Sequence, residues 1–383
     1  MELVDKSVES RYLVDELTKT VDKYNPDTVV GLINLLNKKL KESDDHTEAE
    51  RCSLFPIEEL EAFKLYKLQE TMIWNNSEME FSIDKDDYAS FEPELQHIID
   101  NIFAFFSFSD GRVIENLVFR LMLLCNTLEQ RMFYGLQIFV EQVHSEFYSK
   151  TIDAIIPNPR KRESLYKALD NMPIMKKKDD WMTAYMEADL GPAYTILPYA
   201  CVEGIFFQAG FAFILWFKVI GKMDNVVFGN IQVRKDEAVH RNFAIYKFKQ
   251  LPESQKPPKE HVYKIIQEAV DLETEFIDHI IPKTVEYRSD PDNEFPDAVL
   301  YPEDVKEYIK LTGNHLLVAL GYDSYWKIGE LTGWLHEMAM EGKGNFYEKK
   351  DGNYTNFALT DMYVGSNEDY GKEMYANPED VDF

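Results

Sequence analysis

The pattern of apolar positions along the chain predicts a helical protein. Apolar residues recur with the 3.6-residue period of an α-helix in successive blocks, at 57–74, 91–108, 112–152, 160–171, 195–221, 226–250 and 258–281. Strand-like alternation is nearly absent. The block at 112–152 contains a single helix breaker, Gly135. It predicts either one helix of about 60 Å or two nearly collinear helices, and a helix of that length fits only a large bundle.

Segments outside these blocks suggest three parts in the chain. Residues 1–50 are polar, with one amphipathic stretch between Val29 and Leu40, and predict a peripheral arm. Residues 287–302 are rich in proline and acidic residues and predict a surface loop. Periodicity fades after Lys350. We therefore expect an arm at 1–50, a helical domain at 51–350 and a flexible tail at 351–383.

One block is apolar and long enough to span a membrane. Between Ile196 and Phe217, however, it carries Glu203, Gln208 and Pro198. An ionised glutamate near the middle of a bilayer is costly, and the chain offers no second span to shelter it. We expect a buried helix and no membrane association. A buried glutamate must be paired, protonated or bound to a metal ion.

Composition excludes some functions. The formal net charge is −27 and the sequence pI is about 4.7, so the surface would repel nucleic acids and anionic membranes. The three cysteines show no Cys-x-x-Cys spacing, which suits a reducing compartment. The N-terminus lacks the basic start and apolar run of a secretory signal. A cytoplasmic location is expected.

Three Glu-x-x-His pairs occur, and this spacing places two metal-binding side chains one helical turn apart on one face. They are Glu94/His97, Glu141/His144 and Glu237/His240. The first pair has polar neighbours, which favour a solvated face. The second is embedded among apolar residues, where unpaired polar groups would be costly, so metal binding is favoured. The third has charged flanks that fit a surface helix equally well.

The order of acidic residues along the chain strengthens the case for a metal site. An acid on one helix, a pair on the next, a buried acid on a third and a pair on a fourth are supplied by Asp110, Glu141/His144, Glu203 and Glu237/His240. Four carboxylates and two imidazoles can neutralise and bridge two divalent ions, with open positions for dioxygen. Such donors favour iron or manganese over zinc.

Tyr148 is the candidate for an oxidisable side chain. It follows His144 by four residues and therefore lies on the same helical face, about one turn beyond the metal. The alternative is a core tyrosine whose hydroxyl is hydrogen-bonded.

Four stretches resemble the small subunit of class I ribonucleotide reductases, of the di-iron, tyrosyl-radical type and especially its eukaryotic and viral branch. They are FAFFSFSDGRVIENL, FYGLQIFVEQVHSEFYSKTI, ACVEGIFFQAGFAFILWFK and RKDEAVHRNFA. The candidate acids are 31, 62 and 34 residues apart, which is similar to the family pattern. The resemblance implies an all-α, ferritin-like bundle with extra helices and a di-iron site inside a four-helix core.

The resemblance also implies roles for individual residues. Asp110, Glu141 and His144 would bind mainly one iron, Glu203 and His240 the other, and Glu141 and Glu237 would bridge the two. The oxo- and carboxylate-bridged iron pair would react with dioxygen and leave a stable radical on Tyr148. Phe207, Phe211 and Val233 would shield it.

Trp74 matches the electron-transfer tryptophan of the family, linked through Asp236 to His144. Tyr354 aligns with the relay tyrosine of the tail, although Tyr363, Tyr370 and Tyr375 are alternatives in this chain. The tail would dock on the large subunit, which reduces ribonucleotides to deoxyribonucleotides, and the chain would form a homodimer. Lys235 stands where the family usually has arginine, which retains the charge but loses the planar fork.

Three alternatives remain open at this point. The first is another di-iron oxidase built on the same bundle, such as a hydroxylase, a desaturase or a ferritin-like iron oxidase. The second is a manganese-iron relative, in which the radical tyrosine is typically replaced. The third is a helical interaction protein without enzymatic activity.

Overall fold

The computed structural model describes residues 52–77, 79–167, 172–188, 190–288, 297–331 and 333–335. The predicted arm at 1–50, the tail at 351–383 and its Tyr354 lie outside the described residues. The chain divides into two compact units, Met1–Leu54 and Phe55–Phe383. The description below concerns the second unit.

Helices dominate the described part of the chain, as predicted. They are α3 (Leu60–Thr71), α4 (Ser82–Ser90), α5 (Pro93–Asn116), α6 (Leu128–Ile155), α7 (Pro159–Leu165), α9 (Pro173–Glu187), α10 (Ala193–Cys201), α11 (Gln208–Ile220), α12 (Asp224–Gln250), α13 (Lys259–Ile280) and α14 (Pro302–Leu320). Short helical turns are η1 (Leu117–Leu121), η2 (Met122–Leu124), η3 (Val202–Phe206) and η4 (Glu253–Gln255). The sequence blocks did not predict α4, α9 and α14.

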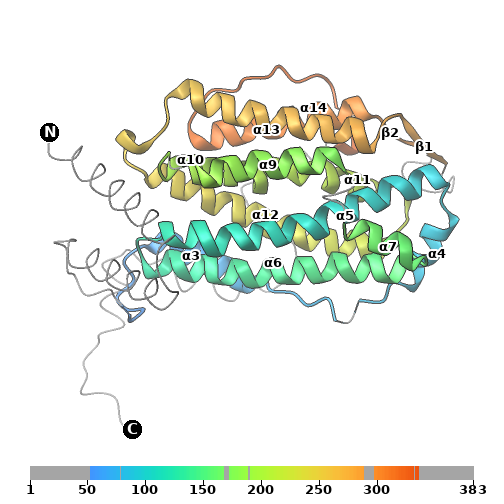
Figure 1. The fold of residues 1–383 in the computed structure, drawn as a ribbon, viewed down its shortest axis with the longest axis horizontal. Helices are drawn as coiled ribbons and strands as arrows, with labels where there is room; N and C mark the ends of the chain where they lie inside the picture. The colour runs from blue at the N-terminus through green and yellow to red at the C-terminus, as the bar shows by residue number, and fades with distance from the viewer. Residues whose placement is uncertain are drawn as a thin grey trace, which may run out of the picture. The chain divides into compact units, whose positions relative to one another are not determined.

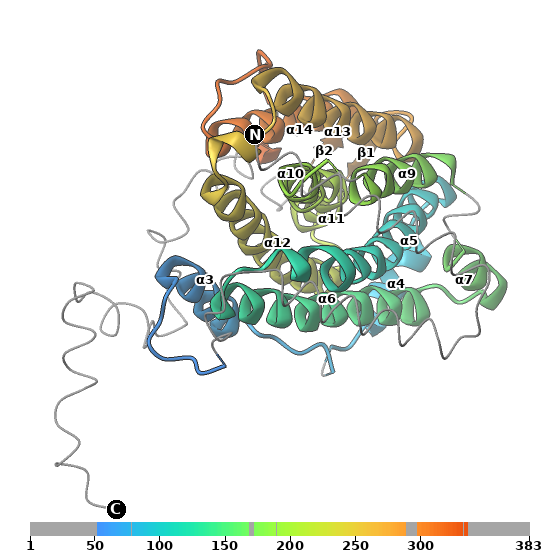
Figure 2. The same ribbon diagram turned by 60° about the vertical axis from the view of Figure 1, so that its left-hand side comes forward.

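The apolar segment α10–η3–α11 runs through the middle of the bundle (Figure 2). It is surrounded by α5 and α6, by α12, by α9 and by the pair α13 and α14. The whole stretch from Ala193 to Ile220 is long and apolar enough for a membrane span, but all of its most apolar window is buried inside the protein. The surrounding helices therefore provide the apolar environment that this segment requires.

The prediction of one long or two collinear helices at 112–152 is wrong. Helix α5 ends at Asn116, the turns η1 and η2 follow, and α6 runs back beside α5 (Figure 1). The reversal has a signal in the sequence, because Thr127 caps α6 by accepting a hydrogen bond from the Gln130 backbone N–H at 3.4 Å. The Gln130 side chain accepts in return from Asn126 N at 3.1 Å. This reciprocal arrangement is a variant of the Thr-x-x-Gln capping box.

The predicted loop at 287–302 is partly regular. Strand β1 (Val285–Arg288) pairs antiparallel with β2 (Asp297–Leu300), in a register that places Val285 opposite Leu300. Leu300 is buried and anchors this hairpin, and α14 begins directly afterwards at Pro302. Residues 289–296 lie outside the described ranges.

Candidate metal centre

Four predicted ligands converge in the core. Glu141, Glu203, Glu237 and His240 each offer one ligand atom, and these atoms lie within 4.8 Å of one another. All four side chains are buried. They come from α6, η3 and α12, which are packed around one interior point.

His144 and Asp110 complete the set of six. His144 Nδ1 lies 3.1 Å from Glu237 Oε1 and 3.4 Å from Glu141 Oε2. Asp110, on α5, is 1% exposed and interacts electrostatically with both histidines and with Glu141 and Glu237. The third Glu-x-x-His pair, which the sequence left undecided, is therefore buried within the same cluster as the second.

Glu141 and Glu237 each face both imidazoles. Glu141 directs Oε1 to His240 Nδ1 at 3.0 Å and Oε2 to His144 Nδ1 at 3.4 Å. Glu237 directs Oε1 to His144 Nδ1 at 3.1 Å and Oε2 to His240 Nδ1 at 3.2 Å. These two carboxylates thus lie between the two histidines.

Burial and mutual charge control the protonation of the cluster. Burial raises the pKa of Asp110 and of Glu203 well above the usual range, and their acidic neighbours raise it further. Burial alone would lower the pKa of His240, but Glu237 and Glu141 outweigh it and raise that pKa to about 9. For the carboxyl group of Glu237 the signs are reversed. Burial alone would raise its pKa, but His240, Glu203 and His144 outweigh burial and lower that pKa. Protons therefore balance the charges of the metal-free cluster.

The donor set fits a pair of divalent cations. Several buried atoms that face the cluster have no hydrogen-bond partner among the described residues, namely Asp110 Oδ2, Glu141 Oε2, Glu203 Oε2 and His144 Nδ1. Buried polar atoms in native proteins are nearly always satisfied, so these lone pairs point to a missing cation. Oxygen donors with only two imidazoles suit iron or manganese better than zinc.

Gln137 is a residue of the site that the sequence analysis did not identify. Its Nε2 lies 2.7 Å from the Tyr199 hydroxyl, 3.0 Å from Glu203 Oε1 and 3.3 Å from Glu141 Oε1. It precedes Glu141 by one helical turn, so its position on the ligand face of α6 was accessible from the sequence. The amide N–H groups hold the carboxylates of two helical segments in register.

Tyr148 is fully buried beside the cluster. Its ring stacks parallel to Phe106, with centroids 4.4 Å apart and an interplanar angle of 4°. Its hydroxyl donates to Asn230 Oδ1 at 3.1 Å. Burial, and then the negative charges of Asp110 and Glu237, raise the pKa of Tyr148 well above its usual range, so the phenol is neutral at physiological pH.

Two of the three residues predicted to shield Tyr148 pack on the ring that stacks on it. Phe207 and Phe211 pack on Phe106, with centroid distances of 5.9 and 5.2 Å, so Phe106 lies between them and the Tyr148 ring. Val233 is 1% exposed on α12. Sequence reasoning missed Phe106 and Asn230, which contact Tyr148 directly.

Trp74, Asp236 and His144 form one hydrogen-bonded chain. Trp74 Nε1 donates to Asp236 Oδ2 at 2.8 Å, and His144 Nε2 lies 3.0 Å from the same oxygen. The indole ring also stacks near the His144 ring, with centroids 6.2 Å apart. Lys235, beside Asp236, is exposed and lies outside this chain.

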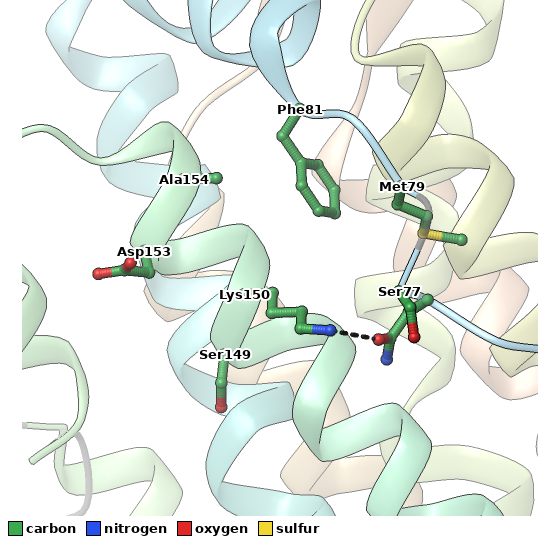
Figure 3. Close-up of a pocket in the computed structure, with 8 residues that line it drawn as sticks. Ser77, Met79, Phe81, Ser149, Lys150, Asp153 and Ala154 are labelled. Atoms are coloured by element: carbon green, nitrogen blue, oxygen red, sulfur yellow. Dashed lines mark hydrogen bonds between the residues drawn. The ribbon is translucent and has the colours of Figure 1, made fainter.

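The segment that carries Trp74 is held against α6. Asn76 Nδ2 donates to the Val143 carbonyl at 3.0 Å, and Lys150 Nζ donates to Asn76 Oδ1 at 2.9 Å. Figure 3 shows Lys150 reaching toward this segment across a surface pocket lined also by Met79 and Phe81. These contacts fix the position of the indole relative to His144.

The first Glu-x-x-His pair lies on the surface, as its polar neighbours predicted. The Glu94 carboxylate is 71% exposed and pairs with Lys283 at 2.5 Å. His97 is also exposed, and its Nε2 contacts Asn101 at 3.0 Å. Both side chains of this pair are thus exposed to solvent and have partners other than the ligands of the buried cluster.

The fold and the site together define a helical protein with a buried carboxylate and imidazole centre. The chain belongs to the family described as "Ribonucleotide reductase, small chain", whose model matches residues 51–330. The chain is 36% identical over 307 residues to ribonucleoside-diphosphate reductase subunit M2 of Homo sapiens, covering 79% of this chain and 75% of that protein. The small chain of Vaccinia virus (strain Western Reserve) is 33% identical over 304 residues, covering 79% and 91%.

Solved structures of similar fold include the Rnr4 homodimer of Saccharomyces cerevisiae and the dimanganese(II)-NrdF of Streptococcus sanguinis. The first has a TM-score of 0.64 and 23% identity, and covers 79% of this chain and 94% of that chain. The second has a TM-score of 0.65 and 18% identity, and covers 76% and 99%. The prediction of an all-α, ferritin-like fold is confirmed.

Proposed function

We propose that this chain is the radical-generating small subunit of a ribonucleoside-diphosphate reductase. The observation that carries the proposal is the convergence of four carboxylates and two imidazoles in the core beside a fully buried tyrosine. The names of the relatives supply the substrate class, and the cluster and Tyr148 supply the chemistry that such a subunit requires.

The six side chains divide between two ions in this proposal. Asp110, Glu141 and His144 hold mainly one, Glu203 and His240 hold mainly the other, and Glu141 and Glu237 bridge. The bridging role is supported by the two carboxylates that each direct one oxygen toward each histidine. Asp236 orients His144 through Nε2 and leaves Nδ1 for the metal.

Iron is the proposed metal, because an oxidisable tyrosine adjoins the cluster. When bound, the iron pair would supply, together with dioxygen, the oxidising power that takes one electron and one proton from Tyr148. The rings of Phe106, Phe207 and Phe211 exclude water and reductants from the phenol. The oxidised side chain would therefore persist.

The proposed partner is the large subunit, where the nucleotide is reduced. Trp74, through Asp236 and His144, would carry the oxidising equivalent from the core toward the surface, and Tyr354 would receive it. The C-terminal tail, which ends in EDVDF, would dock on the large subunit. We further propose a homodimer that acts in the cytoplasm.

Electron paramagnetic resonance after adding ferrous iron and air to the metal-free protein tests this function. The wild type is expected to give a persistent tyrosyl signal and to support ribonucleotide reduction with a large subunit. Tyr148→Phe should bind iron normally but lose both the signal and turnover. Tyr88→Phe is a matched control, because Tyr88 is also buried but donates to Asp100 on α5.

Full activity of Tyr148→Phe would refute the assignment of the radical. Iron binding without a persistent radical in the wild type would favour another di-iron oxidase of the same fold. Metal analysis of protein purified from its native source distinguishes iron from manganese. Protein that takes up no metal after aerobic iron loading would indicate an interaction protein instead.

A further inference from the structure

The amide of Asn230 is fully buried and only half satisfied. Its Oδ1 accepts the hydrogen bond from the Tyr148 hydroxyl at 3.1 Å, while its Nδ2 has no hydrogen-bond partner among the described residues. A primary amide offers both an acceptor and two donors. Leaving its donor end unpaired in the core is unfavourable, so the free N–H groups require an explanation.

Oxidation of Tyr148 would change the hydrogen bond that its oxygen can make. As a phenol, Tyr148 donates its O–H, and Asn230 Oδ1 accepts it. In the proposed function, Tyr148 gives up one electron and one proton to dioxygen. The four-electron reduction of dioxygen would draw two further electrons from the two ferrous ions and one from an external one-electron reductant, such as additional ferrous iron. The remaining phenoxyl oxygen has no proton, so it can only accept a hydrogen bond.

Asn230 cannot be the base that takes this proton, because an amide oxygen is far too weakly basic. It can supply the opposite polarity. A rotation of the Asn230 side chain about its last torsion exchanges Oδ1 and Nδ2, which occupy nearly the same volume. The donor group would then face the oxygen that had previously donated.

We propose that Asn230 is a positioning residue that serves both redox states of Tyr148. Its carbonyl oxygen accepts from the phenol, and after oxidation its Nδ2–H donates to the phenoxyl oxygen. The orphaned Nδ2 in the reduced state is the group held ready for the oxidised state. This inference rests on the proposed function, since it needs an oxidisable Tyr148.

Neighbouring contacts hold the Asn230 side chain beside the Tyr148 hydroxyl. The adjacent Gly229 packs so tightly on Phe147 that a Cβ at Gly229 would come within 2.3 Å of its ring. Phe106 stacks on the Tyr148 ring. The side chain of Asn230 is thus held at the hydroxyl end of Tyr148, where no other described side chain donates a hydrogen bond to its oxygen.

The first experiment uses the wild-type protein, in which the side-chain amides of asparagine are labelled with ¹⁵N. After loading the metal-free protein with ferrous iron and air, pulsed electron–nuclear double resonance is expected to show a ¹⁵N coupling to the tyrosyl radical. Protein equilibrated in D₂O before loading should show an exchangeable deuteron at the phenoxyl oxygen. Absence of the ¹⁵N coupling would overturn the proposal, because it would assign the donor to water or to nothing.

The second experiment is Asn230→Leu, with Asn101→Leu as the control at another buried asparagine, which contacts His97 instead. Asn230→Leu should lose the exchangeable coupling and raise the largest g value of the radical, as expected when a donor to the phenoxyl oxygen is removed. The control should keep both. An unchanged g value in Asn230→Leu would contradict the proposal.

A double-mutant cycle in metal-free protein tests the hydrogen bond without any radical. Tyr148→Phe, Asn230→Leu and the double variant are unfolded in urea, and the effects of the two single changes should not add. Additive effects would show that the two side chains are not coupled and would overturn the inference alone. Coupling in this cycle together with no tyrosyl radical in the wild type would instead overturn the proposed function and, with it, the redox role of Asn230.

Discussion

The Trp74 indole donates a 2.8 Å hydrogen bond to Oδ2 of Asp236. Because His144 Nε2 lies 3.0 Å from the same oxygen, a half-buried aromatic ring and a buried imidazole share one carboxylate atom. This arrangement connects the interior cluster to a side chain near the surface. Substitutions at Trp74 and Asp236 can therefore test two properties separately, namely electron transfer to the large subunit and metal binding.

Trp74→Phe should keep iron and the tyrosyl radical but lose turnover with the large subunit. Phenylalanine fills most of the space but lacks the N–H that bonds to Asp236 and is harder to oxidise than indole. The measurements are iron content, the radical signal and ribonucleotide reduction. Trp181→Phe is the matched control, because Trp181 also donates from Nε1 to a carboxylate, that of Glu268 at 2.9 Å. Normal turnover in Trp74→Phe would remove this residue from the pathway.

Asp236→Ala should weaken metal binding by about 10- to 100-fold, the usual effect of removing the carboxylate that orients a ligating histidine. His144 would lose the partner of Nε2, and its ring would no longer be held with Nδ1 toward the cluster. Titration of the metal-free protein with ferrous or manganous ions measures the affinity. Asp179→Ala should leave affinity unchanged, since Asp179 pairs with Arg112 instead. Equal affinities in wild type and Asp236→Ala would contradict this role.

The candidate ligands could be predicted from the sequence because their spacing along the chain places them on common helical faces. Glu-x-x-His fixes two side chains on one helical face whatever the surroundings, and the buried Glu203 was detectable as an acid in an apolar block. Sequence could not decide whether the pair at Glu237 was buried, because its charged flanks fit either environment. Packing of α12 against η3 and α6 decides it.

The environment of Tyr148 was less accessible, because it depends on how separate helices approach one another. The Phe106 ring stacks on Tyr148 and also lies against α11 at Gly210, where a Cβ would come within 2.6 Å of the ring. The hydrogen bond between Asn230 and the Tyr148 hydroxyl depends on the rotation of α12 relative to α6. Neither relation has a local signature. The reversal before α6 did have one, the Thr127 cap, which the count of helix breakers overlooked.

Breaking the buried ion pair between Lys178 and Glu273 should destabilise the protein strongly. Lys178 Nζ lies 2.5 Å from Glu273 Oε2 and donates to the Phe206 carbonyl at 3.1 Å. Glu273 Oε1 accepts from Ala209 N at 3.0 Å. The pair thus satisfies backbone groups on both sides of Phe207, where η3 passes into α11. Removing one partner leaves a buried charge unpaired, at a cost of about 3–5 kcal/mol.

Urea unfolding of metal-free Lys178→Met, Glu273→Leu and the double variant measures this effect. The double variant should be more stable than the sum of the single changes predicts, because neither buried charge remains. The exposed pair Lys176 and Asp180 on α9 provides the control, and its removal should change stability by less than about 1 kcal/mol. Strict additivity of the two buried substitutions would show that the pair is not coupled.

Phe106→Ala should shorten the lifetime of the tyrosyl radical as well as destabilise the fold. The substitution removes a fully buried ring that stacks on Tyr148 and leaves a cavity, at a cost of about 3–5 kcal/mol. The control is Phe213→Ala, which removes an equally buried ring of α11 that packs on Trp216 and Phe217 instead. Both variants should lower the urea midpoint by similar amounts, but only Phe106→Ala should accelerate decay of the radical signal in the presence of a small reductant such as hydroxyurea. Equal radical lifetimes in the two variants would mean that the shielding of Tyr148 depends on general stability and not on the ring that covers it.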